Sequence, residues 1–193
     1  DALTHAVEAY TSRRATPLSD PFAVDAVKRI FASLPAAYAD GGNKKARESM
    51  AIAAYEAGMC INNASVTLVH GMSRPIGAKF HVPHGLSNAM LLAPCLTFAA
   101  RGAPERFARL SRAVGFAGNG ESNTHAAMAL IDKLAELAKT LDIPTPEGYG
   151  IARDAFMALV PQMAKEALQS GSPANTLCEV TEADVVSLYH SLY

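Results

Sequence analysis

Helical periodicity runs through almost the whole chain, and it restricts the fold more than any other feature. Apolar residues recur at intervals of three and four in segments that end at prolines, glycines or polar clusters. No segment shows the alternation of a half-buried strand, and no internal repeat is present. We therefore expect an all-α protein of about eight helices packed as one domain over residues 1–193, with no substantial sheet. The expected helices cover residues 2–10, 19–34, 43–70, 84–99, 103–114, 123–141, 151–168 and 182–192.

Particular residues set the expected helix boundaries. Ser19 and Thr181 have the side chains of N-caps, and Thr181 begins a variant of the capping box. Pro35 is expected to end the second helix, and Pro94 to interrupt or bend the fourth. Residues 50–61 are apolar nearly all round and rich in small side chains, which predicts a helix enclosed by others.

Composition excludes several classes of partner. The formal net charge is −1, so the chain has no electrostatic footprint for nucleic acid and no polybasic patch for anionic membranes. No window reaches the roughly 18 consecutive apolar residues of a membrane span. Cys60, Cys95 and Cys178 are odd in number and widely spaced, which suggests neither a disulfide framework nor a sulfur-ligated metal. We expect a cytoplasmic protein whose partners are small molecules.

Histidines cluster around one predicted bend. His70, His81 and His84 lie within 15 residues, around Gly77 and Pro83, which bend a chain so that two helices can face each other. His70 is expected to end one helix and His84 to begin another. A connection between helices is therefore predicted over residues 70–84.

Asp1 and His5 form a second pair of candidate ligands. Their i,i+4 spacing puts both side chains on one face of a helix, one turn apart. Together with His70 and His84 they would offer one carboxylate and three imidazoles. This set suits Fe²⁺ or Zn²⁺ and can leave a coordination position open.

Several motifs together resemble the iron-containing (group III) alcohol dehydrogenases. They are residues 1–10, Ser19-Asp20, Leu68-Val69-His70, the run from Pro83 to Ala89 with Leu91-Leu92, and the late turn at residues 170–175. The resemblance is close over residues 1–98. Over residues 99–193 it lies mainly in the helical pattern and the late turn.

The resemblance implies a fold, a cofactor and a site. It implies the helical, metal-binding domain of an NAD- or NADP-dependent alcohol dehydrogenase or aldehyde reductase, of the dehydroquinate synthase-like C-terminal type. The metal, Fe²⁺ before Zn²⁺, would be held by Asp1, His5, His70 and His84, and would polarise the substrate oxygen during hydride transfer. The full-length protein would be a homo-oligomer.

The resemblance also implies that a second domain is missing from this chain. In the resembled family a nucleotide-binding α/β domain precedes this region, whereas this chain starts at Asp1 and contains no G-x-G-x-x-G turn. We therefore expect a fragment whose N-terminal nucleotide-binding domain is absent, and which is inactive by itself.

Four further residues have two interpretations each. Arg74 stands where many members of the family carry a histidine, and it is either a clamp for an anionic substrate or cofactor group or a helix-end arginine. His81 is either a proton relay or an exposed loop residue, and we expect exposure. Ile61 lies near the substrate by resemblance, although helix packing explains it equally well. Glu8 follows His5 by three residues, and we expect a solvated glutamate rather than a hydrogen-bond partner of a metal ligand.

Two alternatives stay open. A non-catalytic helical module, metal-binding or structural, would carry Glu-x-x-His pairs, and none is present. A domain like those of glycerol dehydrogenase or dehydroquinate synthase usually has one carboxylate and two histidine ligands. The set of one aspartate and three histidines favours the iron-containing branch.

Overall fold

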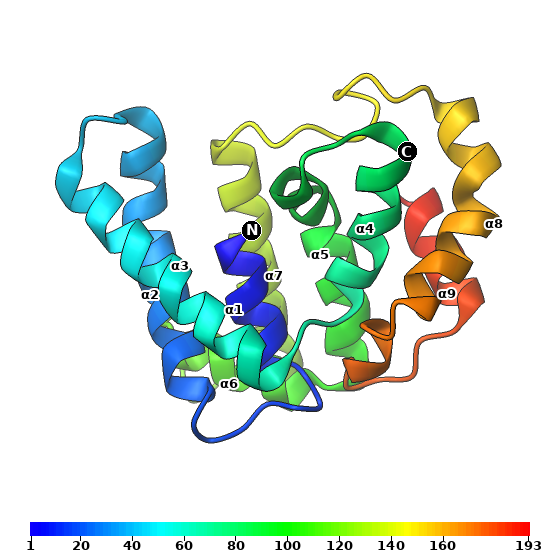
Figure 1. Ribbon diagram of the computed structural model, residues 1–193. Helices are drawn as coiled ribbons and strands as arrows, with labels where there is room; N and C mark the ends of the chain where they lie inside the picture. Colours follow the sequence, from blue (N-terminus) through cyan, green and yellow to red (C-terminus); the bar gives the residue numbers. More distant parts are fainter.

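The computed structural model describes residues 1–193, and its regular structure is entirely helical (Figure 1). Nine α-helices and one short 3₁₀ helix follow in the order α1 (Ala2–Tyr10), α2 (Asp20–Ala39), α3 (Lys44–Ala64), α4 (Leu68–Phe80), α5 (His84–Gly102), α6 (Pro104–Ala113), α7 (Asn123–Thr140), α8 (Arg153–Gln169), η1 (Pro173–Asn175) and α9 (Glu182–His190). The only extended pairing is one antiparallel bridge between Ser12 and Thr176. The prediction of an all-α fold without a sheet is confirmed.

The short helix α1 lies in the middle of the molecule, with the other helices around it (Figure 1). α2 and α3 form a hairpin that packs on one side of α1, while α4 and α5 pair on the other side. α8 and α9 lie beyond α4. Ala6, Val7 and Ala9 of α1 have no exposed surface. A nine-residue helix is marginal alone, so its neighbours must hold it in place.

The expected helix over residues 43–70 is in fact two helices. α3 ends at Ala64, Ser65 adopts a positive φ of 62°, and α4 begins at Leu68. The predicted connection over residues 70–84 is therefore wrong, because most of it is helix α4. Apolar residues still recur at intervals of three and four across the break, at Ala57, Cys60, Ala64 and Leu68, so periodicity alone did not reveal it.

Gly71, within α4, has a packing role. A Cβ on Gly71 would lie 2.6 Å from Cγ of Pro173, so only glycine lets η1 approach α4 this closely. Because α4 begins at Leu68, His70 sits in the first turn of α4 instead of at the end of a helix.

Pro35 and Pro94 both lie inside helices. α2 continues past Pro35 to Ala39, and α5 runs through Pro94 to Gly102. A proline removes one backbone hydrogen bond, but the turn after it can still form. Downstream of Pro35, the N–H of Asp40 donates to the carbonyl oxygen of Ala36. The expected boundary at Pro35 is therefore wrong, and α5 is not interrupted at Pro94.

Helix α3 is not enclosed on all sides, contrary to expectation. Its buried residues form one stripe of small side chains, including Ala53, Ala57 and Cys60, which lets α3 pack closely on α1 and α2. On its other face Tyr55 is 71% exposed and Ile52 is 41% exposed. The apolar composition of α3 therefore produces a partly exposed apolar face in this chain.

The N-terminus of α9 is formed as predicted. Thr181 Oγ1 accepts a hydrogen bond from the N–H of Asp184, whose carboxylate accepts one from the N–H of Thr181. This reciprocal capping box is readable from the sequence because all of its partners are local.

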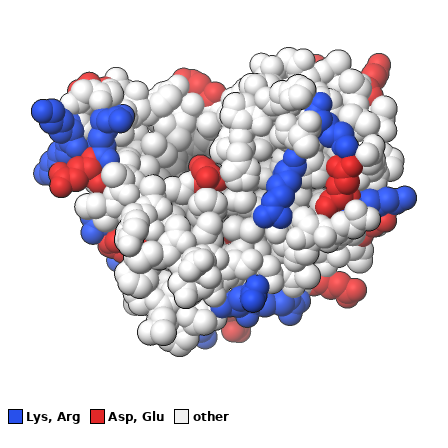
Figure 2. Space-filling view, viewed as in Figure 1, with Lys and Arg blue, Asp and Glu red and all other residues white.

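Charged side chains of both signs are dispersed over the face shown in Figure 2. A hollow on this face separates the α2–α3 hairpin from the rest of the molecule, and the N-terminus that Figure 1 marks lies beside it. None of the helices combines the length and the apolar character needed to cross a bilayer.

Candidate metal centre

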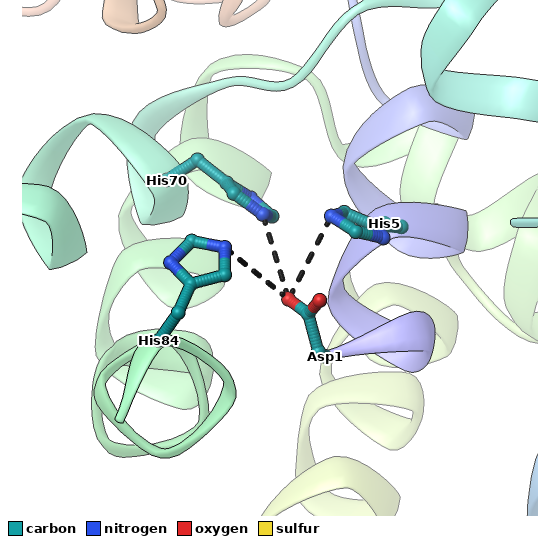
Figure 3. Close-up of side chains that lie close together, drawn as sticks. All are labelled: Asp1, His5, His70 and His84. Atoms are coloured by element: carbon teal, nitrogen blue, oxygen red, sulfur yellow. Dashed lines mark ion pairs between the residues drawn. The ribbon is translucent and has the colours of Figure 1, made fainter. Parts of the chain in front are cut away.

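Four polar side chains from three helices meet at one point (Figure 3). α1 contributes Asp1, its N-cap residue, and His5 one turn later. His70 comes from the first turn of α4, and His84 is the first residue of α5. Each side chain offers one oxygen or nitrogen atom, and these four atoms all lie within 4.8 Å of one another. The structure therefore brings together the four residues that the sequence analysis grouped.

The carboxylate of Asp1 is the common neighbour of the three imidazoles. Its Oδ1 lies 3.6 Å from Nε2 of His5, 3.7 Å from Nε2 of His70 and 3.6 Å from Nε2 of His84. In a tetrahedral site with metal–nitrogen bonds of about 2.0–2.1 Å, neighbouring ligand atoms are about 3.4 Å apart. These separations fit a divalent ion of that size.

Burial favours the neutral form of two of the imidazoles, those of His5 and His84. Desolvation by burial, and to a smaller extent electrostatic repulsion from His70, lowers the pKa of His5 to about 4. Loss of water, with smaller contributions from His70 and Arg74, also lowers the pKa of His84. A neutral imidazole has a free lone pair on one nitrogen, which is the form that binds metals. His5 and His84 can therefore offer a lone pair to a cation at neutral pH.

Glu8 orients one of these imidazoles, so the expectation of a solvated side chain is wrong. Glu8 has no exposed surface. Its Oε1 accepts hydrogen bonds from Thr67 Oγ1 at 2.6 Å and from the N–H of Val69 at 2.7 Å. Its Oε2 lies 2.5 Å from Nδ1 of His70. Because a carboxylate can only accept, Nδ1 of His70 carries the proton and its Nε2 presents a lone pair to Asp1.

The error at Glu8 has a physical cause. The first N–H groups of a helix lack partners within it, and the N–H of Val69 at the start of α4 is one of them. Glu8 supplies that partner. The sequence analysis placed the start of this helix elsewhere, so the need for a buried acceptor at Glu8 was not visible.

A glycine lets α5 approach the start of α1. A Cβ built on Gly85 would lie only 3.1 Å from Cβ of Asp1. Pro83 is the N-cap of α5, and His81 ends α4 in a left-handed conformation with φ of 56°. This short turn brings the first residue of α5 back toward α1.

Arg74 lies outside the four-residue cluster but close enough to influence it. It follows His70 by one turn of α4, is exposed, and donates from Nη1 to Oγ of Ser172 at 2.8 Å. Its positive charge contributes to the lowered pKa of His84. The partner of Arg74 is a side-chain hydroxyl, and no helix-end carbonyl is bonded to it.

The other two predicted site residues do not join the cluster. His81 is exposed, as expected for a loop histidine. Ile61, near the end of α3, is partly buried and packs against the hydrophobic core.

Asn88 is a member of the site that the sequence analysis did not single out. It is fully buried on α5, and its Nδ2 lies 2.7 Å from Oδ1 of Asp1. Its position four residues after His84, on the same helix face, was the available signal.

Comparison with known proteins gives consistent matches over the whole chain. The sequence profile described as Fe-containing alcohol dehydrogenase family, C-terminal, matches residues 1–193. The chain is 36% identical to a 1,3-propanediol dehydrogenase of Citrobacter freundii over 100% of this chain and 49% of that protein. It is 39% identical to an NAD-dependent methanol dehydrogenase of Bacillus methanolicus over 77% of this chain and 39% of that protein.

Solved structures also match the whole chain. A crystal structure of 1,3-propanediol oxidoreductase superposes with a TM-score of 0.93 and 34% identity, covering 100% of this chain and 50% of that one. An alcohol dehydrogenase from Oenococcus oeni gives the same TM-score, identity and coverage. The chain spans about half the length of the curated relatives that it matches.

Proposed function

We propose that this chain, which belongs to the Fe-containing alcohol dehydrogenase family, is the metal-holding half of an NAD(P)-dependent alcohol dehydrogenase or aldehyde reductase. The proposed ligands are Asp1, His5, His70 and His84. The observation that carries the proposal is the meeting of their ligand atoms within 4.8 Å. We further propose that an N-terminal nucleotide-binding domain completes the enzyme, which is supported by the coverage of only half of each relative.

Fe²⁺ is the proposed metal, with Zn²⁺ as the alternative. Three imidazoles and one carboxylate suit either ion, and the family to which the chain belongs is described as iron-containing. The nicotinamide cofactor is proposed at the level of NAD or NADP, because one relative is named NAD-dependent and another, a butanol dehydrogenase of Clostridium saccharobutylicum, NADPH-dependent.

A bound divalent ion would supply a Lewis acid that stabilises negative charge on the alcohol or carbonyl oxygen during hydride transfer. The residues of this chain prepare that site. Asp1 contributes one negative charge, and the neutral His5 and His84 contribute lone pairs. Glu8 holds the Nδ1 proton of His70, which fixes the orientation of the ring and keeps Nε2 free.

We place Arg74, His81 and Ile61 in the vicinity of substrate and cofactor. Arg74 is the best supported of the three, because it is exposed, has no acidic partner among the ion pairs, and influences His84. Its guanidinium can receive a carboxylate or phosphate through two hydrogen bonds.

Metal binding tests the proposal most directly. The protein is stripped with a chelator, and its melting temperature is then measured with anaerobic Fe²⁺, with Zn²⁺ and with Mg²⁺. Fe²⁺ and Zn²⁺ should raise the melting temperature at micromolar concentrations, whereas Mg²⁺, which prefers oxygen ligands, should not. His5→Ala should abolish the effect, and His125→Ala, which removes an exposed histidine, should not. The absence of any rise with Fe²⁺ or Zn²⁺ would refute the metal site.

A further inference from the structure

The carboxamide of Asn88 is buried, and only its nitrogen has hydrogen-bond partners. The residue has no exposed surface, and it lies on α5 one turn after His84. Its Oδ1 is buried without a hydrogen-bond partner. A buried polar atom without a partner is uncommon in folded proteins and requires a physical reason.

The other end of the carboxamide faces the candidate ligands. Nδ2 lies 2.7 Å from Oδ1 of Asp1, 3.1 Å from Nε2 of His70 and 3.2 Å from Nε2 of His84. Oδ1 of Asp1 is an acceptor, and Nε2 of His70 is one because its Nδ1 proton is bonded to Glu8. Nε2 of His84 is an acceptor in the tautomer that carries the proton on Nδ1. The amide thus approaches three of the four ligand atoms at once.

A cation would compete for the same lone pairs. An NH₂ group has two hydrogens for three acceptors, so even the metal-free arrangement leaves one of them poorly satisfied. Once a cation binds these atoms, the positive end of the amide faces a positive ion, which is unfavourable. The two ends of a carboxamide have nearly the same shape and opposite polarity. Turning the group over therefore costs little packing and directs the oxygen toward the cation.

We propose that Asn88 is a fifth residue of the cation site. Without metal, its Nδ2 donates to the ligand atoms and holds them together. With metal, the carboxamide turns over so that Oδ1 faces the ion. This inference rests on the proposed metal site, and the unpartnered Oδ1 means that this oxygen loses no hydrogen bond when the group turns over.

Two substitutions of similar shape separate this role from simple packing. Asn88→Leu removes both polar ends while filling the same space. Asn88→Asp offers oxygen at both ends, so it needs no turn to face a cation, but in the metal-free protein it places a carboxylate against three acceptors. Thr97→Val serves as the control, because Thr97 is on the same helix and its hydroxyl only donates to the carbonyl oxygen of Ala93.

The experiment uses Co²⁺ as a visible probe of the site. The chelator-stripped protein and the three variants are titrated with Co²⁺, and the dissociation constant, the visible absorption spectrum and the metal-free melting temperature are recorded. Asn88→Leu should weaken Co²⁺ binding by about tenfold or more and change the spectrum. Asn88→Asp should lower the metal-free melting temperature and tighten Co²⁺ binding. Thr97→Val should match the original protein in both binding and spectrum.

Other outcomes would overturn the inference. Unchanged binding and an unchanged spectrum in Asn88→Leu and Asn88→Asp would reduce Asn88 to a packing residue while leaving the metal site intact. Weaker binding in Asn88→Asp would also overturn it. If Asn88→Leu does not fold, Asn88→Asp alone decides. Failure of the unsubstituted protein to bind Co²⁺ would refute the metal site itself, which distinguishes the two failures.

Discussion

Glu8 and His70 are 62 residues apart in the chain, yet Oε2 of Glu8 lies 2.5 Å from Nδ1 of His70 with neither side chain open to water. This bond connects α1, which carries two of the candidate ligands, with α4, which carries a third. It also determines which nitrogen of His70 is free. The geometry of the candidate site therefore depends on a residue that would not touch the metal.

Replacement of Glu8 should weaken metal binding and stability together. Glu8→Gln keeps the shape but replaces one acceptor by an NH₂ group, which leaves a buried donor on α4 or His70 without a partner. We expect a 10- to 100-fold loss of Zn²⁺ affinity and about 1–3 kcal/mol loss in the free energy of unfolding. Calorimetric titration and urea unfolding measure the two effects. Glu48→Gln, at an exposed glutamate of α3, is the control and should change neither.

Gly85 should tolerate no side chain without displacing Asp1. A Cβ at this position comes within 3.1 Å of Cβ of Asp1, so Gly85→Ala should push Asp1 away from the imidazoles. We expect weaker Zn²⁺ binding with little change in metal-free stability, because Asp1 is at the end of α1. Gly120→Ala, where a Cβ meets nothing within 4 Å, is the matched control. Equal affinities in the two variants would contradict the prediction.

Arg74 should matter for charged substrates more than for neutral ones. In the longer protein that carries this chain, Arg74→Ala should raise the KM for an alcohol or aldehyde bearing a carboxylate by a factor equivalent to about 1.5–3 kcal/mol, the cost of a lost charged hydrogen bond. The KM for a neutral alcohol should change little. Steady-state kinetics on a matched pair of substrates measures the difference, and equal changes for both would exclude a clamp.

The 193-residue chain alone should not catalyse the redox reaction. It spans about half of each curated relative, and its all-helical structure contains no strand followed by a glycine-rich turn and a helix to hold a dinucleotide. Even when loaded with Fe²⁺, it should form no NADH from NAD and a simple alcohol, as followed by absorbance. Measurable turnover by this chain would show that the proposed division between a cofactor half and a metal half is wrong.

The thiol of Cys60 should make the protein less stable in alkali. Burial, with a smaller contribution from Glu56, raises the pKa of Cys60 to about 11. In the unfolded chain the thiol of Cys60 ionises near pH 8.5. Between about pH 8.5 and 11 the unfolded chain has therefore lost a proton that the folded protein retains. The free energy of unfolding must decrease as the pH rises through this range. The decrease should reach about 3 kcal/mol near pH 11. Urea unfolding under reducing conditions at pH 7.5 and 10.5 should show a smaller decrease for Cys60→Ser than for the unsubstituted protein.

Local patterns predicted part of this structure well. The pair of Asp1 and His5 follows from their i,i+4 spacing on a helix, and the capping box of Thr181 involves only its neighbours in sequence. The all-α class follows from periodicity. In each case the deciding interactions lie within a few residues of one another.

Interactions between distant segments account for the errors. The break at Ser65 is hidden because apolar residues recur at helical spacing on both sides of it. The buried position of Glu8 depends on where α4 begins. Asn88 joins the site only because three helices converge on it. The sequence analysis brought His70 and His84 together through a predicted bend around Gly77 and Pro83, whereas in the structure most of that segment is helix α4.

The late turn at η1 has a consequence for the order of events during synthesis. Asn175 donates from Nδ2 to the carbonyl oxygen of Val66, and its own carbonyl oxygen accepts from the N–H of Arg13. It thus ties the segment after α1 to the segment before α4, although all four candidate ligands are made within the first 84 residues. During synthesis the four ligands therefore leave the ribosome before the turn that connects these two segments. The bonds of Asn175 can form only after residues 173–176 have been made.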